Sequence, residues 1–508
     1  MIKPSFQEFK KASKNANLIP IFKEVLADMD TPITAFLKTA TNSYSVLLES
    51  VEHGEHLGRY SFIAISPFLI FRSTSNRVTL LSENNRVLDQ FTVNDPLDEL
   101  KNILRRFKPA QVKGLPRFWG GAIGYVGYDV IRFFEGIPDK NPRELTLPDI
   151  EFIFTDSILI FDHLFHTIKV INCVRIDRKK SLSVQYEKGR RKIEEIIRQL
   201  KKNLFISKPV YKPQKRLIAK SNFTKASFQK IVKKAKQYIF DGEIIQVVLS
   251  QRIRFRLNNV NPLLVYRALR LVNPSPYMYY LKFGKTTIIG SSPEILVRIE
   301  GKNAELRPIA GTRPRGGTLL EDRRLEEELI NDPKEIAEHI MLLDLGRNDL
   351  GKVCEFGSVK VEEQMKIERY SHVMHLVSSV VGKLRGNSDE FKLFKSCFPA
   401  GTVTGAPKIR AMQIIDELEN VRRGPYAGAV GYFGFNRNMD MAIAIRTIFL
   451  RNNKAFIQAG AGVVADSIPA REYKETKNKT EALIKAIKMS LQGSSLAIHP
   501  IHIGENRK

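Results

Sequence analysis

The sequence lacks the features of a secreted or membrane-spanning protein. Its 508 residues include only three cysteines, too few and too widely spaced to predict a disulfide framework or a zinc site. No run of about 18 apolar residues is present that could cross a membrane as a helix. Met1–Lys11 has no apolar segment typical of a secretory signal. We therefore expect a cytoplasmic protein with no membrane partner.

Acidic residues are scarce relative to basic ones. There are 54 Asp and Glu against 81 Lys and Arg, which gives a formal net charge of +27. Such a charge can indicate nucleic-acid binding, but the basic residues are spread along the chain. The densest basic stretch, Arg178–Lys236, carries apolar residues at helical spacing, so its charges are typical of solvated helix faces. No recognised nucleic-acid-binding motif accompanies them, and we expect no nucleic-acid partner, although a basic nucleic-acid-binding protein stays as an unfavoured alternative.

The remaining composition predicts a folded protein of two domains or of one large composite domain. The chain is 43% hydrophobic and longer than one core usually organises. Short strands are expected from about residue 30 to 175. Helices such as Leu319–Leu343 are expected to alternate irregularly with strands after residue 221, including an apparent hairpin of Met441–Leu450 with Lys454–Ala459. These patterns favour antiparallel sheets with outer helices over a doubly wound parallel sheet. The predicted division is 1–177, a basic helical boundary at 178–220, a second folded region at 221–495 and a tail at 496–508.

Two pairs of glutamates stand out in the second half of the chain. Glu335 and Glu338, like Glu472 and Glu475, are three residues apart and face one way if their segments are helical. Four carboxylates from two elements would suit Mg²⁺, which prefers oxygen ligands. The same spacing is common on exposed helices, and spacing alone favours that simpler interpretation.

Glycine-rich segments offer a possible anion site. Gly311-Thr312 and Gly460-Ala-Gly462 could present backbone N–H groups to an anion, and Arg446 could bind a carboxylate through two hydrogen bonds. Tight turns between strands would also explain the glycines, and spacing alone favours that interpretation. Neither segment is a phosphate-binding loop or a dinucleotide fingerprint. His375, flanked by apolar residues, is more often a core residue than a ligand.

Taken together and in this order, the segments resemble the chorismate-utilising enzymes. The resemblance runs from about Leu47 to Ala482. It implies an α+β fold in which two antiparallel sheets stack, outer helices cover them, and the active site lies in the cleft between the sheets. It also makes 221–495 the catalytic region. The resemblance is densest at Pro308–Gly316, Glu338–Asp349, Pro399–Pro407, Arg423–Phe433 and Gln458–Lys479.

The resemblance also implies roles for individual residues. A bound Mg²⁺ would hold the ring carboxylate of chorismate, and its ligands would be Glu338 and Glu475, with Glu335 and Glu472 beside them. The other substrate contacts would be Gly311, Thr312, Tyr426, Arg446, Gly460, Ala461 and Gly462. The catalytic group would comprise Glu294 as general acid, His375 near the ring, and Thr402 in the same cleft.

Two positions favour one activity among the sister enzymes. Gln246 stands where isochorismate and salicylate synthases carry a lysine that activates water, and glutamine cannot act as a general base. Ala310 stands where aminodeoxychorismate synthase carries a nucleophilic lysine. The resemblance is therefore closest to the anthranilate-forming branch. That implies a lyase in which ammonia attacks chorismate and pyruvate is eliminated, the first committed step of tryptophan biosynthesis. Aminodeoxychorismate synthesis stays as the disfavoured alternative.

Two further expectations concern partners. The chain has no recognisable Cys–His–Glu amidotransferase motif, which implies a separate glutamine amidotransferase subunit that supplies ammonia. Leu47–Ser50 and Asn273–Met278 resemble the two segments that bind tryptophan as a feedback inhibitor, and the first of them places an effector segment in the N-terminal region. A strand and a turn would explain these segments without any ligand. The predicted effector contacts are Ser50, Pro276, Tyr277 and Met278.

Overall fold

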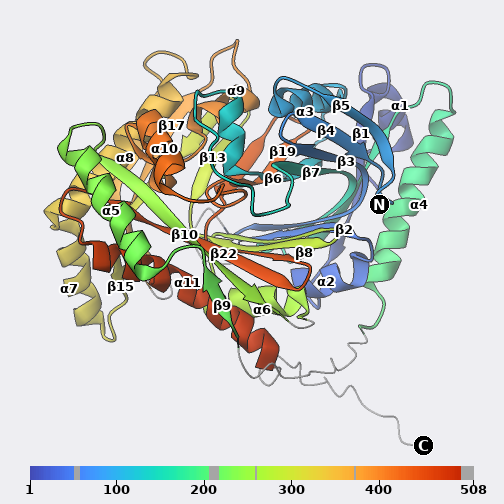
Figure 1. Ribbon diagram of the computed structural model, residues 1–508. Coiled ribbons are helices and arrows are strands. Elements are labelled where there is room, and N and C mark those ends of the chain that lie inside the picture. The colour runs from blue at the N-terminus through green and yellow to red at the C-terminus, as the bar shows by residue number, and fades with distance from the viewer. Residues whose placement is uncertain (51–57, 205–216, 258–259, 371–372, 493–508) are drawn as a thin grey trace, which may run out of the picture.

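The computed structural model describes residues 1–50, 58–204, 217–257, 260–370 and 373–492. Two layers of strands form its centre, and helices flank them (Figure 1). Every ladder between the described strands is antiparallel, as the sequence predicted. The predicted tail at 496–508 lies outside the described residues.

The first layer runs from the N-terminal to the C-terminal part of the chain. Strand β2 of the N-terminal part pairs with β11, so this layer joins residues more than 200 positions apart. Its order is β1 (Leu18–Leu26), β8 (Thr167–Arg175), β7 (Ile150–Asp162), β3 (Tyr60–Thr74), β2 (Tyr44–Glu49), β11 (Tyr277–Phe283), β12 (Thr286–Ser292), β21 (Thr447–Arg451), β22 (Lys454–Val463) and β10 (Gln246–Arg256), with β9 (Ala219–Ser221) and β18 (Gly405–Ala406) paired to β10.

The second layer shares two long strands with the first. The ladder between β3 and β7 is interrupted by a bulge at Pro67–Leu69, next to Ser66 with a φ of 51°. One half of each strand therefore belongs to each layer. The second layer has the order β5 (Val87–Thr92), β4 (Arg77–Leu81), β3, β7, β6 (Gly121–Val126), β19 (Ala429–Gly434), β20 (Met439–Ile443), β13 (Ile295–Glu300), β14 (Asn303–Leu306), β17 (Val373–Lys383), with β15 (Ile309–Pro314) and β16 (Lys360–Arg369) paired to β17.

Both faces of the first layer are buried. Val46 belongs to a core that combines side chains of both layers, and its neighbour Leu47 to a core on the opposite face, because successive side chains of a strand alternate. The rings of Tyr125 in β6 and Phe283 in β11 stack across the layers, 6.4 Å apart. The predicted stacking of two antiparallel sheets is thereby confirmed.

Helices cover the outer face of the first layer and the sides of the second (Figure 1). The outer face is covered by α1 (Phe6–Ala12), α2 (Pro32–Thr39), α4 (Leu182–Leu200), α6 (Pro262–Val272) and α11 (Pro469–Gln492). The remaining helices are α3 (Pro96–Arg105), α5 (Lys225–Phe240), α7 (Leu319–Ile330), α8 (Pro333–Gly351), α9 (Glu390–Cys397) and α10 (Lys408–Leu418), with the short turns η1 (Tyr128–Phe133) and η2 (Gly401–Val403). Among the helices that the structure describes, none is long and apolar enough to cross a membrane.

The structure corrects two details of the expected elements. The single helix expected over Leu319–Leu343 is two helices, α7 and α8. Asp332 caps the second and Pro333 occupies its first turn, where proline's missing N–H costs nothing. The expected hairpin is formed by β21 and β22, whereas Met441 lies in β20.

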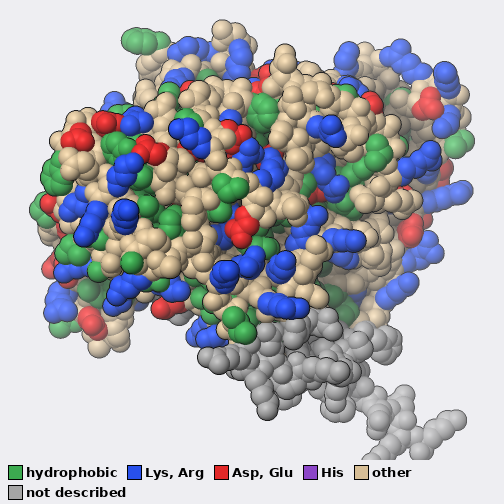
Figure 2. All heavy atoms as spheres, viewed as in Figure 1, with side chains coloured by type: hydrophobic (Ala, Val, Ile, Leu, Met, Phe, Trp, Pro, Cys, Tyr) green, Lys and Arg blue, Asp and Glu red, His purple; other side chains and the backbone are tan. Residues whose placement is uncertain are grey.

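The first helix of the basic stretch has a defined place. This helix, α4, packs against β8, β1, α1 and α2, and so belongs to the N-terminal half of the fold, whereas the second helix, α5, packs against α11 and β10. On the face shown in Figure 2, Lys and Arg side chains are scattered among other types. The domain boundaries themselves stay a prediction, because strands on either side of them share both layers.

Candidate active site

The predicted site residues come from both layers and from two helices. Gly460 and Gly462 lie on β22 of the first layer, while Gly311, Thr312 and His375 lie on β15 and β17 of the second. The charge of Arg446, just before β21, lowers the pKa of His375, which places these two groups near each other. The helices α8 and α11 carry one glutamate pair each. The arrangement agrees with a cleft between the sheets.

Around Gly460, cationic and hydroxyl groups converge. A Cβ on Gly460 would lie 2.8 Å from the Tyr426 hydroxyl oxygen, so only glycine allows this approach. Lys479 Nζ donates a hydrogen bond to the Gly460 carbonyl at 3.0 Å, and Arg446 Nη1 donates to the Lys479 carbonyl at 2.9 Å. Burial lowers the pKa of Arg446, and the opposing charges of Tyr426 and Glu475 favour its charged form. This cluster can bind an anionic group.

The glutamates of α8 approach β22 through Gln246, which lies on the neighbouring strand β10. Gln246 Nε2 donates to Glu338 Oε1 at 3.0 Å, and a Cβ on Gly462 would lie 2.6 Å from that amide nitrogen. Burial raises the pKa of Glu335, an effect opposed by Arg313 at 3.3 Å and increased by the charge of Glu338. Of the α8 pair, Glu335 is thus paired with the Arg313 guanidinium, and Glu338 is bonded to the neutral amide of Gln246.

The glutamates of α11, Glu472 and Glu475, form a second acidic pair. Burial raises the pKa of Glu472, and the Glu475 charge raises it further. Glu475 itself is paired with Lys479 at 2.7 Å. The charge of Lys334, on α8, also acts on Glu472, so the two helices approach each other here.

Carboxylates in this state suit a divalent cation. Burial and the charge of the neighbouring glutamate raise the pKa of Glu335 and of Glu472, and a cation would oppose both effects. In the part of the chain that the structure describes, no three His, Cys, Asp or Glu side chains already converge at metal-binding distances. Gln246, Arg313 and Lys479 hold three of the four glutamates instead. The donor set fits Mg²⁺ by its chemistry.

His375 is oriented by the backbone of β15. Its Nδ1 lies 3.1 Å from the Gly311 carbonyl oxygen and 3.0 Å from Thr312 Oγ. Since a carbonyl only accepts, Nδ1 carries the proton in the bond to Gly311 and Nε2 is left as the acceptor. Burial lowers the pKa of His375, and the Arg446 charge lowers it further. The imidazole is thus neutral at neutral pH.

The backbone and its neighbours require glycine at position 311. Its φ is 65°, in the left-handed region, and an added Cβ would lie 2.8 Å from Leu329 Cδ1 and 3.2 Å from Glu335 Oε2. The bulge between Ala310 and Thr312 thus brings β15 against the acidic helix α8.

Glu294 has the properties of a proton donor. Its side chain lies between β12 and β13, and burial raises its pKa to about 8, against the opposing effects of the Thr402 hydroxyl and the Lys479 charge. The carboxyl is therefore protonated at neutral pH. Thr402 Oγ is buried, and among the described residues it has no hydrogen bond of good geometry, so it faces Glu294 with bonding capacity unused.

The predicted effector residues gather in a separate cavity. Ser50, Pro276, Tyr277 and Met278 all line a pocket that is open to solvent, together with Asp440 and other side chains of both halves. The pairing of β2 with β11, which sets Glu49 opposite Met278, joins the two segments. The structure thus brings the two predicted segments into one pocket.

Comparison with known proteins agrees with this geometry. The family described as chorismate binding enzyme matches residues 45–485. The chain belongs to the chorismate-binding enzyme family. It is 50% identical over 493 residues to anthranilate synthase component 1 of Aquifex aeolicus, covering 96% of this chain and 98% of the relative. It is 50% identical over 494 residues to the protein of that name from Acetivibrio thermocellus, with 96% and 99% covered.

Solved structures give the same family fold. Anthranilate synthase component I from Streptococcus pneumoniae aligns with a TM-score of 0.75 at 37% identity, covering 90% of this chain and 99% of that one. The menaquinone-specific isochorismate synthase of Escherichia coli aligns with a TM-score of 0.69 at 18% identity, covering 95% and 98%, and at that identity shows the fold alone. The resemblance that the sequence indicated is confirmed.

One residue of this chorismate-binding enzyme was missed from the sequence. Lys479 contacts Glu475 and Gly460 and acts on the charge of Glu294, so it connects the acidic pair, the glycine strand and the acid. Its position four residues after Glu475 in a helix was a usable signal, because side chains at that spacing meet.

The raised pKa of Glu294 predicts a pH-dependent contribution to stability. The native enzyme keeps a proton that the unfolded chain, with the usual pKa of 4.5, releases. The stability that Glu294 contributes relative to glutamine is therefore fully present below about pH 4.5 and is lost as the pH rises towards 8, by at most about 1.4 kcal/mol per pH unit. Urea unfolding of wild type and Glu294→Gln at about pH 5 and pH 8 measures this change.

The exposed Glu481→Gln on α11 serves as the control, for which no comparable pH-dependent difference is expected. A stability difference between wild type and Glu294→Gln that is equal at the two pH values would contradict a protonated, buried carboxyl.

Proposed function

We propose that this enzyme converts chorismate and ammonia to anthranilate, pyruvate and water, the first committed step of tryptophan biosynthesis. The observation that carries the proposal is the bond between Gln246 and Glu338: the position that would hold a water-activating lysine holds an amide without basic character. Ala310, buried in β15, offers no nucleophile either. The relatives named anthranilate synthase component 1 support the same activity.

The site residues account for the steps of this reaction. Arg446, Tyr426 and the backbone of Gly460–Gly462 bind the enolpyruvyl carboxylate. Ammonia forms a bond to a ring carbon, and the ring hydroxyl leaves as water with the proton that Glu294 holds. Elimination of pyruvate with loss of a ring proton then leaves the aromatic product. His375, neutral and with Nε2 free to accept, is placed to take part in that proton transfer.

A metal ion and a partner complete the proposal. Mg²⁺ held by Glu338 and Glu475, with Glu335 and Glu472 beside them, would neutralise the ring carboxylate of the substrate. A separate glutamine amidotransferase subunit would supply ammonia, as the name "component 1" of the relatives suggests. Cytoplasmic location fits the three buried, free cysteines.

The cavity at Ser50 fits an inhibitor with an amino acid moiety and an aromatic ring. Apolar side chains such as Phe62, Met278 and Val430 line it together with the charged groups of Arg117 and Asp440. Asp440 accepts hydrogen bonds from the Tyr277 hydroxyl and from Arg298 Nε, both at 3.0 Å, which fixes its orientation. We propose tryptophan as the ligand, binding as a feedback inhibitor at a distance from the active site.

The activity is tested with the purified chain alone. It is expected to form anthranilate from chorismate with ammonium at alkaline pH, where free NH₃ is abundant, and to form none with glutamine. Anthranilate fluorescence and a coupled pyruvate assay measure the two products, which should appear in equal amounts. Use of glutamine by the chain alone would contradict the separate partner, and an aminodeoxychorismate product would contradict the proposed reaction.

The metal assignment is tested by Glu338→Gln and Glu475→Gln. Each removes one anionic ligand, and we expect kcat/KM with Mg²⁺ to fall by about 100-fold, roughly 3 kcal/mol of charge stabilisation. The rise in Tm that Mg²⁺ gives the wild type should shrink in both variants. Glu481→Gln, exposed on the same helix as Glu475, is the matched control. Full activity of Glu475→Gln without added metal would refute the assignment.

The effector assignment is tested by Ser50→Phe. A phenyl group in place of the small hydroxymethyl fills the cavity, and tryptophan inhibition is expected to weaken at least tenfold, about 1.4 kcal/mol. Calorimetric titration with tryptophan measures the affinity directly, with Ser183→Phe on the exposed side of α4 as control. If about 1 mM tryptophan changes neither activity nor heat in the wild type, the cavity has another ligand.

A further inference from the structure

A buried ion pair lies behind the candidate active site, beside β10 and the turn that carries Thr402. The Arg423 side chain is 1% exposed and that of Glu419 is 2% exposed. Arg423 Nε and Nη2 donate to the two carboxylate oxygens of Glu419 at 3.0 and 2.7 Å, in the bidentate geometry of a strong pair. Neither residue belongs to the groups assigned to chorismate or to the metal. The pair lies between the end of α10 and the start of β19.

Arg423 donates hydrogen bonds to two backbone segments of the candidate active site. Its Nη1 donates to the Val403 carbonyl at 2.7 Å, which fixes the turn that carries Thr402. Its Nη2 donates to the Val248 carbonyl at 2.6 Å, and Val248 is the register partner of Gly462. The guanidinium also lies 5.5 Å from the ring centre of Tyr426, whose hydroxyl approaches Gly460.

Glu419 holds β10, the strand paired with the Gly460–Gly462 segment of β22, next to the Arg423 bond to Val248. Its Oε1 accepts from Ser250 N at 2.8 Å and from Ser250 Oγ at 2.7 Å. Ser250 is the register partner of Gly460. Gln458 Nε2 donates to the same Ser250 hydroxyl at 2.8 Å. One ion pair therefore contacts the supports of three groups that face chorismate: Thr402, Tyr426 and the segment from Gly460 to Gly462.

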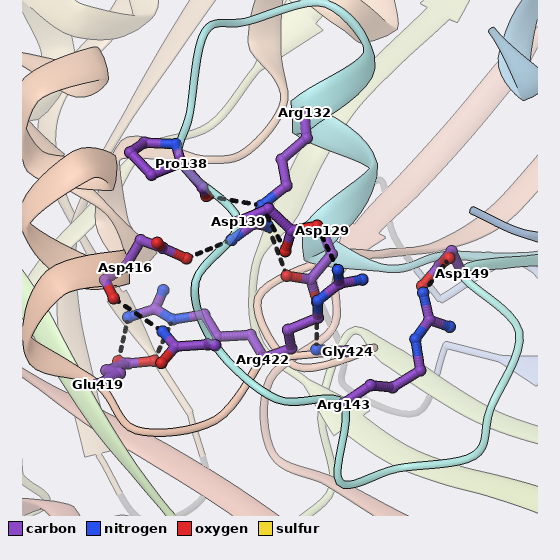
Figure 3. A network of polar contacts seen from close by, with 12 residues as sticks. Asp129, Arg132, Pro138, Asp139, Arg143, Asp149, Asp416, Glu419, Arg422 and Gly424 are labelled. Atoms are coloured by element: carbon purple, nitrogen blue, oxygen red, sulfur yellow. Dashed lines mark hydrogen bonds and ion pairs between the residues drawn. The ribbon is translucent and has the colours of Figure 1, made fainter. Parts of the chain in front are cut away.

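The pair is itself held by the N-terminal half of the chain. Gly424 N donates to Asp129 Oδ2 at 2.7 Å, and Tyr128 N donates to the Gly424 carbonyl at 2.7 Å. Arg132 joins Asp129 to Asp416 of α10, and Figure 3 shows this network around Gly424, with Glu419 at its edge. The Arg423 guanidinium lies 4.8 Å from the Tyr128 ring centre on this side.

We infer that Arg423, oriented by Glu419, is a positioning residue for the substrate pocket of this enzyme, an inference that rests on the proposed function for its kinetic consequences. The pair belongs to none of the groups assigned to the substrate. The planar guanidinium of Arg423 nevertheless sets the distance between the Thr402 turn and β10, the strand that pairs with Gly460–Gly462 of β22. Lysine keeps the charge but cannot bond to both carbonyls and the carboxylate at once. A displacement of about 1 Å in such a wall costs on the order of 100-fold in rate.

The test compares Arg423→Lys with Arg72→Lys. Arg72, whose side chain is 31% exposed, forms a similar ion pair with the buried Glu151, at 2.7 Å, and its other bond is to Tyr44, so it serves as a control for the loss of a guanidinium paired with a buried carboxylate. Steady-state kinetics with chorismate and ammonium are measured well below the Tm of both variants. We expect kcat/KM of Arg423→Lys to fall about 100-fold, mainly through kcat, and that of Arg72→Lys to stay within about twofold.

Amide hydrogen exchange provides a readout that does not require activity. Exchange at residues 401–404 and 458–462 should quicken in Arg423→Lys and stay at the wild-type rate in Arg72→Lys. If Arg423→Lys does not fold, Glu419→Gln, which keeps the side-chain length, is measured in its place. Equal kcat/KM in the Arg423 and Arg72 variants, or unchanged exchange in both segments, would overturn the inference. A wild type that forms no anthranilate refutes the proposed function, and the exchange comparison still decides the positioning role.

Discussion

The pairing of β10 with β22 is the constraint on which the pocket depends. In this ladder Val248 lies opposite Gly462 and Ser250 opposite Gly460. The register places Gln246 at the end where it reaches Glu338 on α8. A slip by one residue would turn every side chain of β22 to the opposite face. The glycines would then no longer meet Tyr426 and Gln246, and the proposed anion site on β22 would be lost.

The buried charges of the site are arranged around that strand. Glu294 is kept protonated by burial, whereas Arg446 and Lys479 are held close to carboxylates or carbonyls. One member of each glutamate pair forms an ion pair, Glu335 with Arg313 and Glu475 with Lys479, while burial and the neighbouring carboxylate raise the pKa of Glu335 and of Glu472. Two carboxylates beside one cationic partner are the physical reason for expecting a further cation there.

Interleaving of the two halves of the chain connects the proposed effector cavity with the catalytic groups. The first half supplies β2 and the second half β11, and these paired strands form the cavity wall at Ser50 and Met278. The next ladder sets Tyr277 opposite Ser292, two residues before Glu294. A ligand that moved β11 would therefore act on a strand that ends two residues before Glu294, the proposed general acid. The network at Gly424 gives the N-terminal half a second contact with the pocket wall.

The sequence by itself determined the family and the antiparallel layers, because these depend on local patterns and on motifs in a fixed order; the roles of the site residues stay a prediction. Gln246 and Ala310 could be interpreted in the same way, since the chemical capacity of a side chain does not depend on its neighbours.

The sequence could not show that α7 ends before Pro333, or that Lys479 joins Glu475 to Gly460. Nor could it show that Arg423 bonds both to the turn that carries Thr402 and to β10. The partners of Arg423 include Val248 and Val403, residues far apart in the chain, and only packing of the layers brings such groups within hydrogen-bond distance. Burial, which raises the pKa of Glu294, likewise comes from the tertiary structure, because a side chain loses water only when other elements cover it.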